Sequence, residues 1–281
     1  PEKGVCDAKH VGDLIEQLSL ANVLVGHNII DFDLPFLLKR FPAVMPAAVA
    51  GKGIIDTLYL SPVAFPRNPY HHLYKDYKPY PLSQNKPDED AMAARRLLED
   101  EERVLVDLPG EARSVLMTLL SRCPKTSAFS SRLSHEFERL TQRQMVMTAQ
   151  EYWGTRLCIH ALPDVVRQAW DDGMAAWALA VVLAWIDAED GVSIIGRWPR
   201  EQTPFAAQFL HALRATPCKD PACSWCRSFG ATERLRQLFD FDEFRPNQQV
   251  IVDAALAGDN ILAILPTGGG KSLCFQLPAL M

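Results

Sequence analysis

The spacing of apolar and polar positions in the first part of the chain predicts alternating helices and strands. Apolar residues at i, i+3, i+4 and i+7 predict an amphipathic helix over 11–20. Apolar runs predict strands at 22–25 and 53–60, with a helix over 32–40 between them. A long loop at 61–88 and a helix at 90–105 follow. This alternation indicates an α/β unit that ends near residue 106.

The pattern changes after residue 106. Residues 107–215 show helical spacings broken by Pro and Gly, with little strand character. The most apolar run, 174–186, is shorter than the roughly 20 residues that span a membrane, so it predicts a buried helix. Two helices are expected after residue 231, and the β-branched run 261–265 predicts a buried parallel strand. The chain therefore divides into 1–106, 107–230 and 231–281.

Composition changes this picture little. The 281 residues are 48% hydrophobic and 22% charged, as in an ordinary globular protein. A net charge of −5 excludes a wholly basic nucleic-acid coat but allows a local basic channel. The start at Pro1 has no signal-peptide pattern, so we expect a cytoplasmic protein with no membrane partner. Because no initiator Met is present and the chain stops at Met281, just after the expected phosphate loop, we expect an internal fragment.

Residues 266–272, Pro-Thr-Gly-Gly-Gly-Lys-Ser, form a candidate phosphate-binding loop. Glycines let the backbone turn its N–H groups toward an anion at a helix N-terminus. Lys271 supplies charge for the outer phosphates of ATP, and Ser272 can ligate Mg²⁺. The alternative is a flexible surface loop. The expected nucleotide-binding residues here are Thr267, Gly268, Gly269, Gly270, Lys271 and Ser272.

Three residues ahead of this loop suit an adenine ring. Phe241 offers an aromatic face, the Gln248 amide can satisfy the edge of the base, and Arg245 can pair with phosphate or assist the stack. Phe239 and Phe244 are expected to pack inward instead.

Together, residues 234–281 closely resemble the first two motifs of RecQ-family DNA helicases. Leu265 replaces the usual first glycine of the phosphate loop, a variant that resembles superfamily 2 helicases. The resemblance implies the start of a RecA-like ATPase domain that acts on single-stranded or partly duplex DNA. A generic phosphate-loop ATPase unrelated to DNA is the rival interpretation.

Acidic residues mark the first unit. Asp33 ends the segment N-x-x-x-F-D from Asn28, and Asp90 opens a later helix. Two such carboxylates can hold hard cations such as Mg²⁺ or Mn²⁺. The alternative is that both aspartates only cap helices.

Residues 26–36 are similar to the second motif of DnaQ-like (DEDD) 3′–5′ exonucleases, and Asp90-Ala91 is similar to the third. This resemblance implies part of an RNase H-like exonuclease domain, in which Asp33 and Asp90 are catalytic metal ligands. Asn85 and Lys86 stand where that family has its His or Tyr base, and no D-x-E first motif is present. His71 or His72 is a candidate replacement base. The alternative is an inactive, DNA-tethering module.

Cys218, Cys223 and Cys226 form C-x₄-C-x₂-C in the middle region. Zinc takes four Cys or His ligands, so this spacing predicts a zinc knuckle that needs one more ligand. His211 is the first candidate, followed by Cys158, His160 and Cys123. An iron–sulfur cluster fits less well, since it generally uses four cysteines. Three reduced cysteines in a loop are the alternative.

The combined interpretation is a DnaQ-like exonuclease, a helical spacer with a zinc knuckle and a RecQ-type helicase, fused in one protein. Such a protein would use ATP and Mg²⁺ to unwind DNA in repair and recombination.

Overall fold

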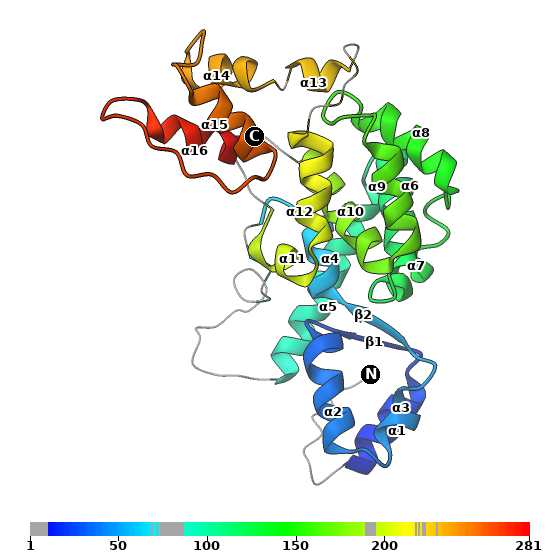
Figure 1. Cartoon of the computed structure of the whole chain (residues 1–281). Helices are drawn as coiled ribbons and strands as arrows, with labels where there is room; N and C mark the ends of the chain where they lie inside the picture. Colours follow the sequence, from blue (N-terminus) through cyan, green and yellow to red (C-terminus); the bar gives the residue numbers. More distant parts are fainter. Residues whose placement is uncertain are drawn as a thin grey trace.

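The structure, a computed structural model, describes residues 11–68, 70, 71, 73, 87–188, 195–216, 218, 220, 223–228 and 230–281. Within these residues it is mostly helical, with one parallel sheet of two strands. Helices α1–α3, within residues 11–49, lie at one end of the molecule, and helices α14–α16, within residues 231–280, lie at the other (Figure 1). No helix in this described part is long and apolar enough to cross a bilayer.

The first unit contains the sheet. β1 (Val23–Gly26) pairs in parallel with β2 (Gly53–Asp56), in register from Val23↔Gly53 to Gly26↔Asp56. The predicted helices over 11–20 and 90–105 are confirmed as α1 and α5. The other elements of this unit are α1 (Val11–Leu20), the π-helical turn η1 (Ile29–Asp33), α2 (Leu34–Arg40), α3 (Met45–Val49), α4 (Thr57–Ala64) and α5 (Pro87–Val106).

The predicted strand over 53–60 is wrong in its second half, because residues 57–64 form helix α4. Asp56 causes the change, since its side chain accepts the Leu58 N–H at 3.0 Å and so caps the helix. Every residue of α4 is buried, and a short apolar run of this kind has no period that separates strand from helix. The predicted loop over 61–88 therefore begins only after Ala64.

The middle region is helical, as predicted, and is built around α10 (Gly173–Asp187). All residues from Ala175 to Ile186 are buried, which confirms the interpretation of this apolar run. Asp172 caps α10 by accepting the N–H groups of Met174 and Ala175 at 2.7 and 2.9 Å. The remaining elements are α6 (Gly110–Arg122), α7 (Ser127–Arg132), α8 (Gln142–Trp153), α9 (Leu162–Asp171), α11 (Arg197–Gln202), α12 (Phe205–Leu210) and the π-helical turn η2 (His211–Ala215).

One hydrophobic core runs through the first unit and the middle region. It includes Ile55 of β2, Leu105 of α5 and Trp177 of α10. The Trp177 indole N–H donates to the Tyr59 carbonyl at 2.8 Å, and the two rings meet edge to face at 5.3 Å. The boundary near residue 106 stays a prediction, because burial is continuous across it.

The last part of the chain forms a separate small core. Helices α14 (Ala231–Phe239), α15 (Gln248–Leu256) and α16 (Lys271–Leu280) form this core, and the short helix α13 (Ser224–Ser228) precedes them. The buried residues of the core are Leu235, Val252, Leu273 and Leu277. The two helices expected after residue 231 are thereby confirmed.

The buried strand predicted over 261–265 is wrong. These residues are extended but are not in a strand, and Leu262 and Ile264 are 89% and 88% exposed. A strand requires a hydrogen-bonded neighbour. Among the described residues the only sheet is β1–β2, at the far end of the molecule (Figure 1). The apolar pattern indicated a strand but could not supply the partner that a strand needs.

Candidate nucleotide-binding and metal-binding sites

The phosphate loop is a tight turn that only glycine fits easily. Gly268 and Gly270 have φ values of +81° and +76°, in the left-handed region that L-residues avoid. A Cβ on Gly270 would lie 2.1 Å from the Gln248 side-chain nitrogen. The Gly269 N–H donates to the Pro266 carbonyl at 3.0 Å and closes the turn. The glycine run is therefore required by backbone conformation and by close packing together.

Arg245 and Gln248 hold the carbonyl side of the loop. An Arg245 guanidinium nitrogen donates to the Gly268 carbonyl at 2.6 Å. The Gln248 amide nitrogen lies 3.1 Å from the Gly270 carbonyl and 3.3 Å from the Gly269 carbonyl. Because three successive carbonyls are held in this way, the loop N–H groups other than that of Gly269, which closes the turn, are left for an anion.

Lys271 and Ser272 begin helix α16 directly after the loop, and both are exposed. Gly270 precedes the helix and offers no side-chain cap, so the first N–H groups of α16 lack an intrahelical acceptor. Such a helix start attracts phosphate, and Thr267 lies exposed beside it. Lys271 also borders a groove of about 490 Å³ that lies between residues 261–265 and helices α15 and α16.

The three residues predicted to bind adenine differ in how accessible they are to a ligand. Phe241 is 52% exposed, so its ring is open to a ligand. Gln248 is only 2% exposed, and its amide oxygen accepts the Arg245 backbone N–H at 2.9 Å. Its amide nitrogen donates to the Gly269 and Gly270 carbonyls of the loop. Phe239 and Phe244 pack against the small core, which confirms the prediction that they point inward. Adenine recognition by Phe241, Arg245 and Gln248 stays a prediction.

Comparison with known proteins supports a helicase at this end of the chain. Residues 245–281 match the DEAD/DEAH box helicase family. The chain is 53% identical to ATP-dependent DNA helicase RecQ of Synechocystis sp. over 49 residues, 17% of this chain and 10% of that protein. It is 52% identical to ATP-dependent helicase SGS1 of Saccharomyces cerevisiae over 48 residues, covering 17% of this chain and 3% of that protein.

A third relative is ATP-dependent DNA helicase Q1 of Rattus norvegicus, 54% identical over 46 residues, 16% of this chain and 7% of that protein. The predicted resemblance to RecQ-type helicases is confirmed over this short stretch. The chain spans a tenth or less of the length of these relatives. No solved structure matches the chain.

Asp33 and Asp90 do not behave as simple helix caps. Asp33 is exposed at the start of α2, and its side chain makes no capping hydrogen bond there. Asp90 is the fourth residue of α5, inside the helix, and is half-buried. Desolvation raises the pKa of Asp33, although its own backbone N–H opposes the shift. Neither aspartate joins a group of three or more metal-ligating side chains among the described residues.

The structure reveals other acidic residues near Asp33 that the sequence patterns did not single out. Asp56 accepts the N–H groups of Asn28 and Ile30 at 2.8 and 3.0 Å, and so fixes the turn that leads to η1. Asp31 forms an ion pair with Lys125 at 2.8 Å. An Asp inside the apolar run 53–60 was the available signal in the sequence for the first of these interactions.

Burial disfavours the charged form of two carboxyl groups, those of Asp56 and of Glu101 on α5. Burial raises the pKa of Asp56, although its three backbone N–H donors oppose the shift. Glu101 on α5 is fully buried, and its two oxygens have no hydrogen-bond partner in the described part of the chain. Burial, with the charge of Asp56 next in effect, raises the pKa of Glu101 well above its usual range. Burial therefore disfavours the charged form of the Glu101 side chain.

His71, a candidate replacement base, is buried, and its Nδ1 lies 3.1 Å from the Ser61 hydroxyl. His72, Asn85 and Lys86 lie outside the described residues.

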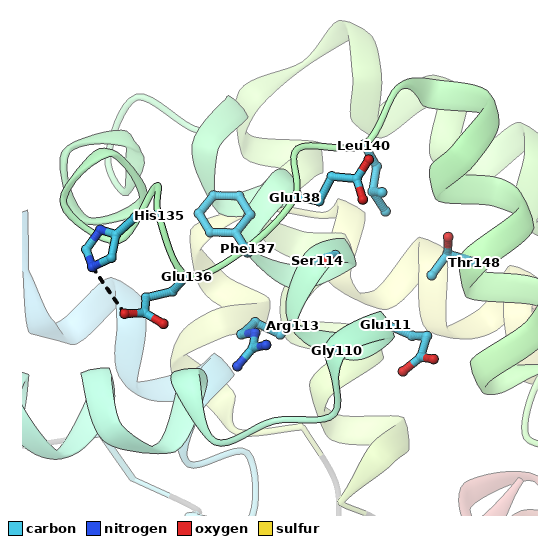
Figure 2. Close-up of a pocket in the computed structure, with 10 residues that line it drawn as sticks. All are labelled: Gly110, Glu111, Arg113, Ser114, His135, Glu136, Phe137, Glu138, Leu140 and Thr148. Carbon is cyan, nitrogen blue, oxygen red and sulfur yellow. Dashed lines mark ion pairs between the residues drawn. The ribbon is translucent and has the colours of Figure 1, made fainter.

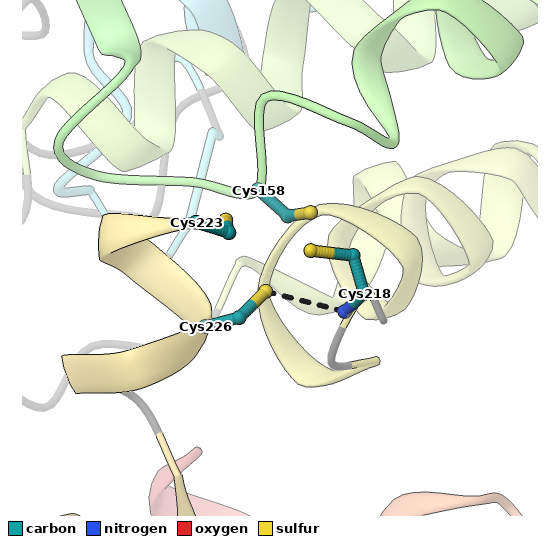
Figure 3. A group of neighbouring side chains, drawn as sticks. All are labelled: Cys158, Cys218, Cys223 and Cys226. Carbon is teal, nitrogen blue, oxygen red and sulfur yellow. Dashed lines mark hydrogen bonds between the residues drawn. The ribbon is translucent and has the colours of Figure 1, made fainter. Parts of the chain in front are cut away.

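The cysteine motif gathers four thiols rather than three thiols and a histidine. The Sγ atoms of Cys158, Cys218, Cys223 and Cys226 all lie within 4.8 Å of one another (Figure 3). The Cys158 N–H donates to the Leu213 carbonyl at 2.7 Å, which brings its loop beside η2.

His211, the first candidate for the fourth ligand, is not a member of this group of thiols. It lies in η2 and lines a separate hollow with Ala231 and Asp253. The other two candidates are also engaged elsewhere. His160 pairs with Asp220 at 3.4 Å, and Cys123 is buried at the end of α6.

A further hollow of about 510 Å³ lies in the middle region (Figure 2). His135 and Glu136 on its rim pair with each other at 3.1 Å. Acidic, basic and apolar side chains alternate around it without converging, so it is not a candidate active site.

Proposed function

We propose that this chain is part of an ATP-dependent DNA helicase of RecQ type, with residues 231–281 forming the start of its ATPase domain. The observation that carries the proposal is the phosphate loop, whose carbonyl side is held by Arg245 and Gln248. A loop restrained on that side presents its N–H groups and the start of α16 to a nucleotide. The similarity to RecQ-type helicases over the same residues supports DNA as the partner.

Each residue has a distinct proposed task. Lys271 neutralises the outer phosphates of ATP, Ser272 ligates Mg²⁺, and Phe241 stacks on adenine. Mg²⁺, when bound, neutralises charge that develops on the transferred phosphoryl group. Gln248 would have to exchange its present hydrogen bonds to reach the base, so we propose that it acts first by holding the loop. We also propose that the protein is cytoplasmic and acts in DNA repair or recombination.

The helicase proposal predicts ATP turnover that depends on DNA. In the full-length protein that contains this chain, tailed duplex DNA is expected to raise the rate of ATP hydrolysis at least about tenfold, since nucleic acid completes a motor site of this kind. Lys271→Ala is the control that should remove both basal and stimulated rates. Turnover that needs Lys271 but ignores DNA would refute the helicase and support the generic ATPase.

For the first unit, we propose a DnaQ-like 3′–5′ exonuclease fold fused to the helicase. Its support is the N-x-x-x-F-D segment, which follows β1 and places Asp33 at the end of η1. Helix α5, which carries Asp90, packs beside β1. Two carboxylates contributed by these two elements would suit Mg²⁺ or Mn²⁺ if they converge on one ion. The second candidate is an inactive DNA-tethering module, favoured because His71 is buried against Ser61 and not open to a substrate.

Nuclease assays on single-stranded DNA with Mn²⁺ separate these two candidates. If the site is active, Asp33→Ala in the full-length protein should lower 3′-end degradation about 100-fold or more, because a ligand of the catalytic metal is lost. Asp31→Ala is a matched control two residues away, since Asp31 pairs with Lys125 instead. Equal background from wild type and both variants would establish the inactive module.

A further inference from the structure

The four thiols, here called the cysteine cluster (Cys158, Cys218, Cys223 and Cys226), have the geometry of a closed site for one metal ion. In tetrahedral zinc sites the Zn–S distance is about 2.3 Å, so neighbouring sulfurs lie about 3.8 Å apart. The four Sγ atoms are all within 4.8 Å of one another, close to that spacing without any ion (Figure 3). We propose that the cysteine cluster binds a single structural Zn²⁺, with Cys158 as the fourth ligand.

The surroundings of the cysteine cluster suit thiolate ligands. Cys158 and Cys223 are 1% and 2% exposed, so water has little access to one side of the site. The Cys218 N–H donates to the Cys226 sulfur at 3.3 Å (Figure 3). Hydrogen bonds from backbone N–H groups to sulfur favour the negative thiolate. Four thiolates this close repel one another strongly unless a cation lies between them.

Other uses of four thiols fit less well. All six described cysteines are free, so no disulfide joins members of the cysteine cluster. An iron–sulfur cluster places several iron and sulfide atoms between its thiolates and requires a wider cage. Zn²⁺, which forms four short bonds to sulfur ligands, matches the close spacing of these four sulfur atoms.

The cysteine cluster joins two distant parts of the sequence. Cys158 lies between α8 and α9 of the middle region, whereas the other three lie between η2 and α14, on the path to the phosphate loop. A nearby contact ties the same segments, since His160 pairs with Asp220. Within the second segment, the Arg214 guanidinium lies 4.7 Å from the centre of the Trp225 ring.

Met281, after α16, packs on both the cysteine cluster and the small core of α14–α16. Zn²⁺ would therefore clamp the start of the ATPase domain to the helical region. This role does not depend on whether the helicase or the exonuclease is active.

Metal analysis of the full-length protein, or of this chain, tests the proposal. Wild type should contain about one equivalent of zinc, as a single closed site requires. Cys158→Ala should lose most of it, whereas His211→Ala should retain it. Zinc that persists in Cys158→Ala and disappears in His211→Ala would overturn the assignment of the fourth ligand. A folded wild type that takes up no zinc, or that carries iron and sulfide, would overturn the site.

X-ray absorption spectroscopy at the zinc edge tests the ligand set in the wild-type protein, so the result does not depend on whether a cysteine variant folds. Four sulfur neighbours at about 2.3 Å are expected. Three sulfurs and one nitrogen at about 2.0–2.1 Å would overturn Cys158 as a ligand.

The clamp role has its own test. Removal of zinc with a chelator should speed proteolytic cleavage between residues 216 and 230 at least about tenfold, since a released metal loop opens locally. Unchanged cleavage would overturn the clamp role.

Discussion

Gly270→Ala is expected to weaken ATP binding about 100-fold, a loss of roughly 3 kcal/mol. Part of this loss comes from the backbone, because φ is +76° at this position and alanine is strained there by about 1 kcal/mol. The rest comes from Gln248, whose side-chain nitrogen lies 2.1 Å from the position of the new Cβ. Gln248 must move away, and its hydrogen bonds to the Gly269 and Gly270 carbonyls, worth about 1 kcal/mol each, are then lost.

Gly258→Ala is the matched control. Gly258 has φ +81° and no atom within 4 Å of an added Cβ, and it lies outside the phosphate loop. It should show the backbone strain alone, as a drop of about 1 kcal/mol in unfolding free energy with unchanged ATP affinity. Fluorescent-nucleotide titration and urea unfolding of both variants provide the comparison. Equal ATP affinity in the two variants would contradict the role given to the loop.

A double-mutant cycle locates the effect in the pair. In a Gln248→Ala background the clash is removed, so Gly270→Ala should cost only the backbone term of about 1 kcal/mol. Additive losses would mean that Gln248 does not support the loop.

Local patterns predicted the elements that depend only on local spacing. The helix over 11–20 and the buried helix of 174–186 follow from hydrophobic period and run length, and both are present. The glycine run 268–270 was expected to let the backbone turn, and two of its members have a positive φ. In each case the physical cause lies within a few residues of the element.

The wrong predictions arose where a contact that the hydrophobic pattern does not show decides the structure, either near in sequence, as at Asp56, or distant. The run 261–265 has strand character but no neighbouring strand in the described chain. Residues 57–60 became helix because Asp56 caps them, and an apolar run alone does not separate the two states. Cys158 is 60 positions before Cys218, and tertiary contacts of its loop, such as the hydrogen bond to the Leu213 carbonyl, bring the two together. The preference of zinc for thiolate was the one signal that could have ranked Cys158 above His211.

Asp56→Ala is expected to destabilise the first unit by about 3 kcal/mol or more, because buried donors are left without acceptors. Asp56 is 1% exposed, and its two oxygens accept N–H groups from Asn28, Ile30 and Leu58 at 2.8, 3.0 and 3.0 Å. These bonds tie the end of β2 to the turn after β1 and start helix α4. Alanine would remove all three acceptors, and water cannot easily replace them in the core.

Urea unfolding of Asp56→Ala and Asp31→Ala separates this buried network from surface charge. Asp31 lies in the same turn, but its ion pair with Lys125 is partly exposed and it accepts one hydrogen bond, from the Tyr59 hydroxyl at 2.6 Å, so its loss should cost less, about 1–2 kcal/mol. Hydrogen exchange should locate the damage, with faster exchange of the Asn28, Ile30 and Leu58 amides in Asp56→Ala only. Because the same turn positions Asp33, any metal site there depends on Asp56 even though Asp56 need not touch the metal. Similar unfolding midpoints for the two variants would show that the turn is held by other contacts.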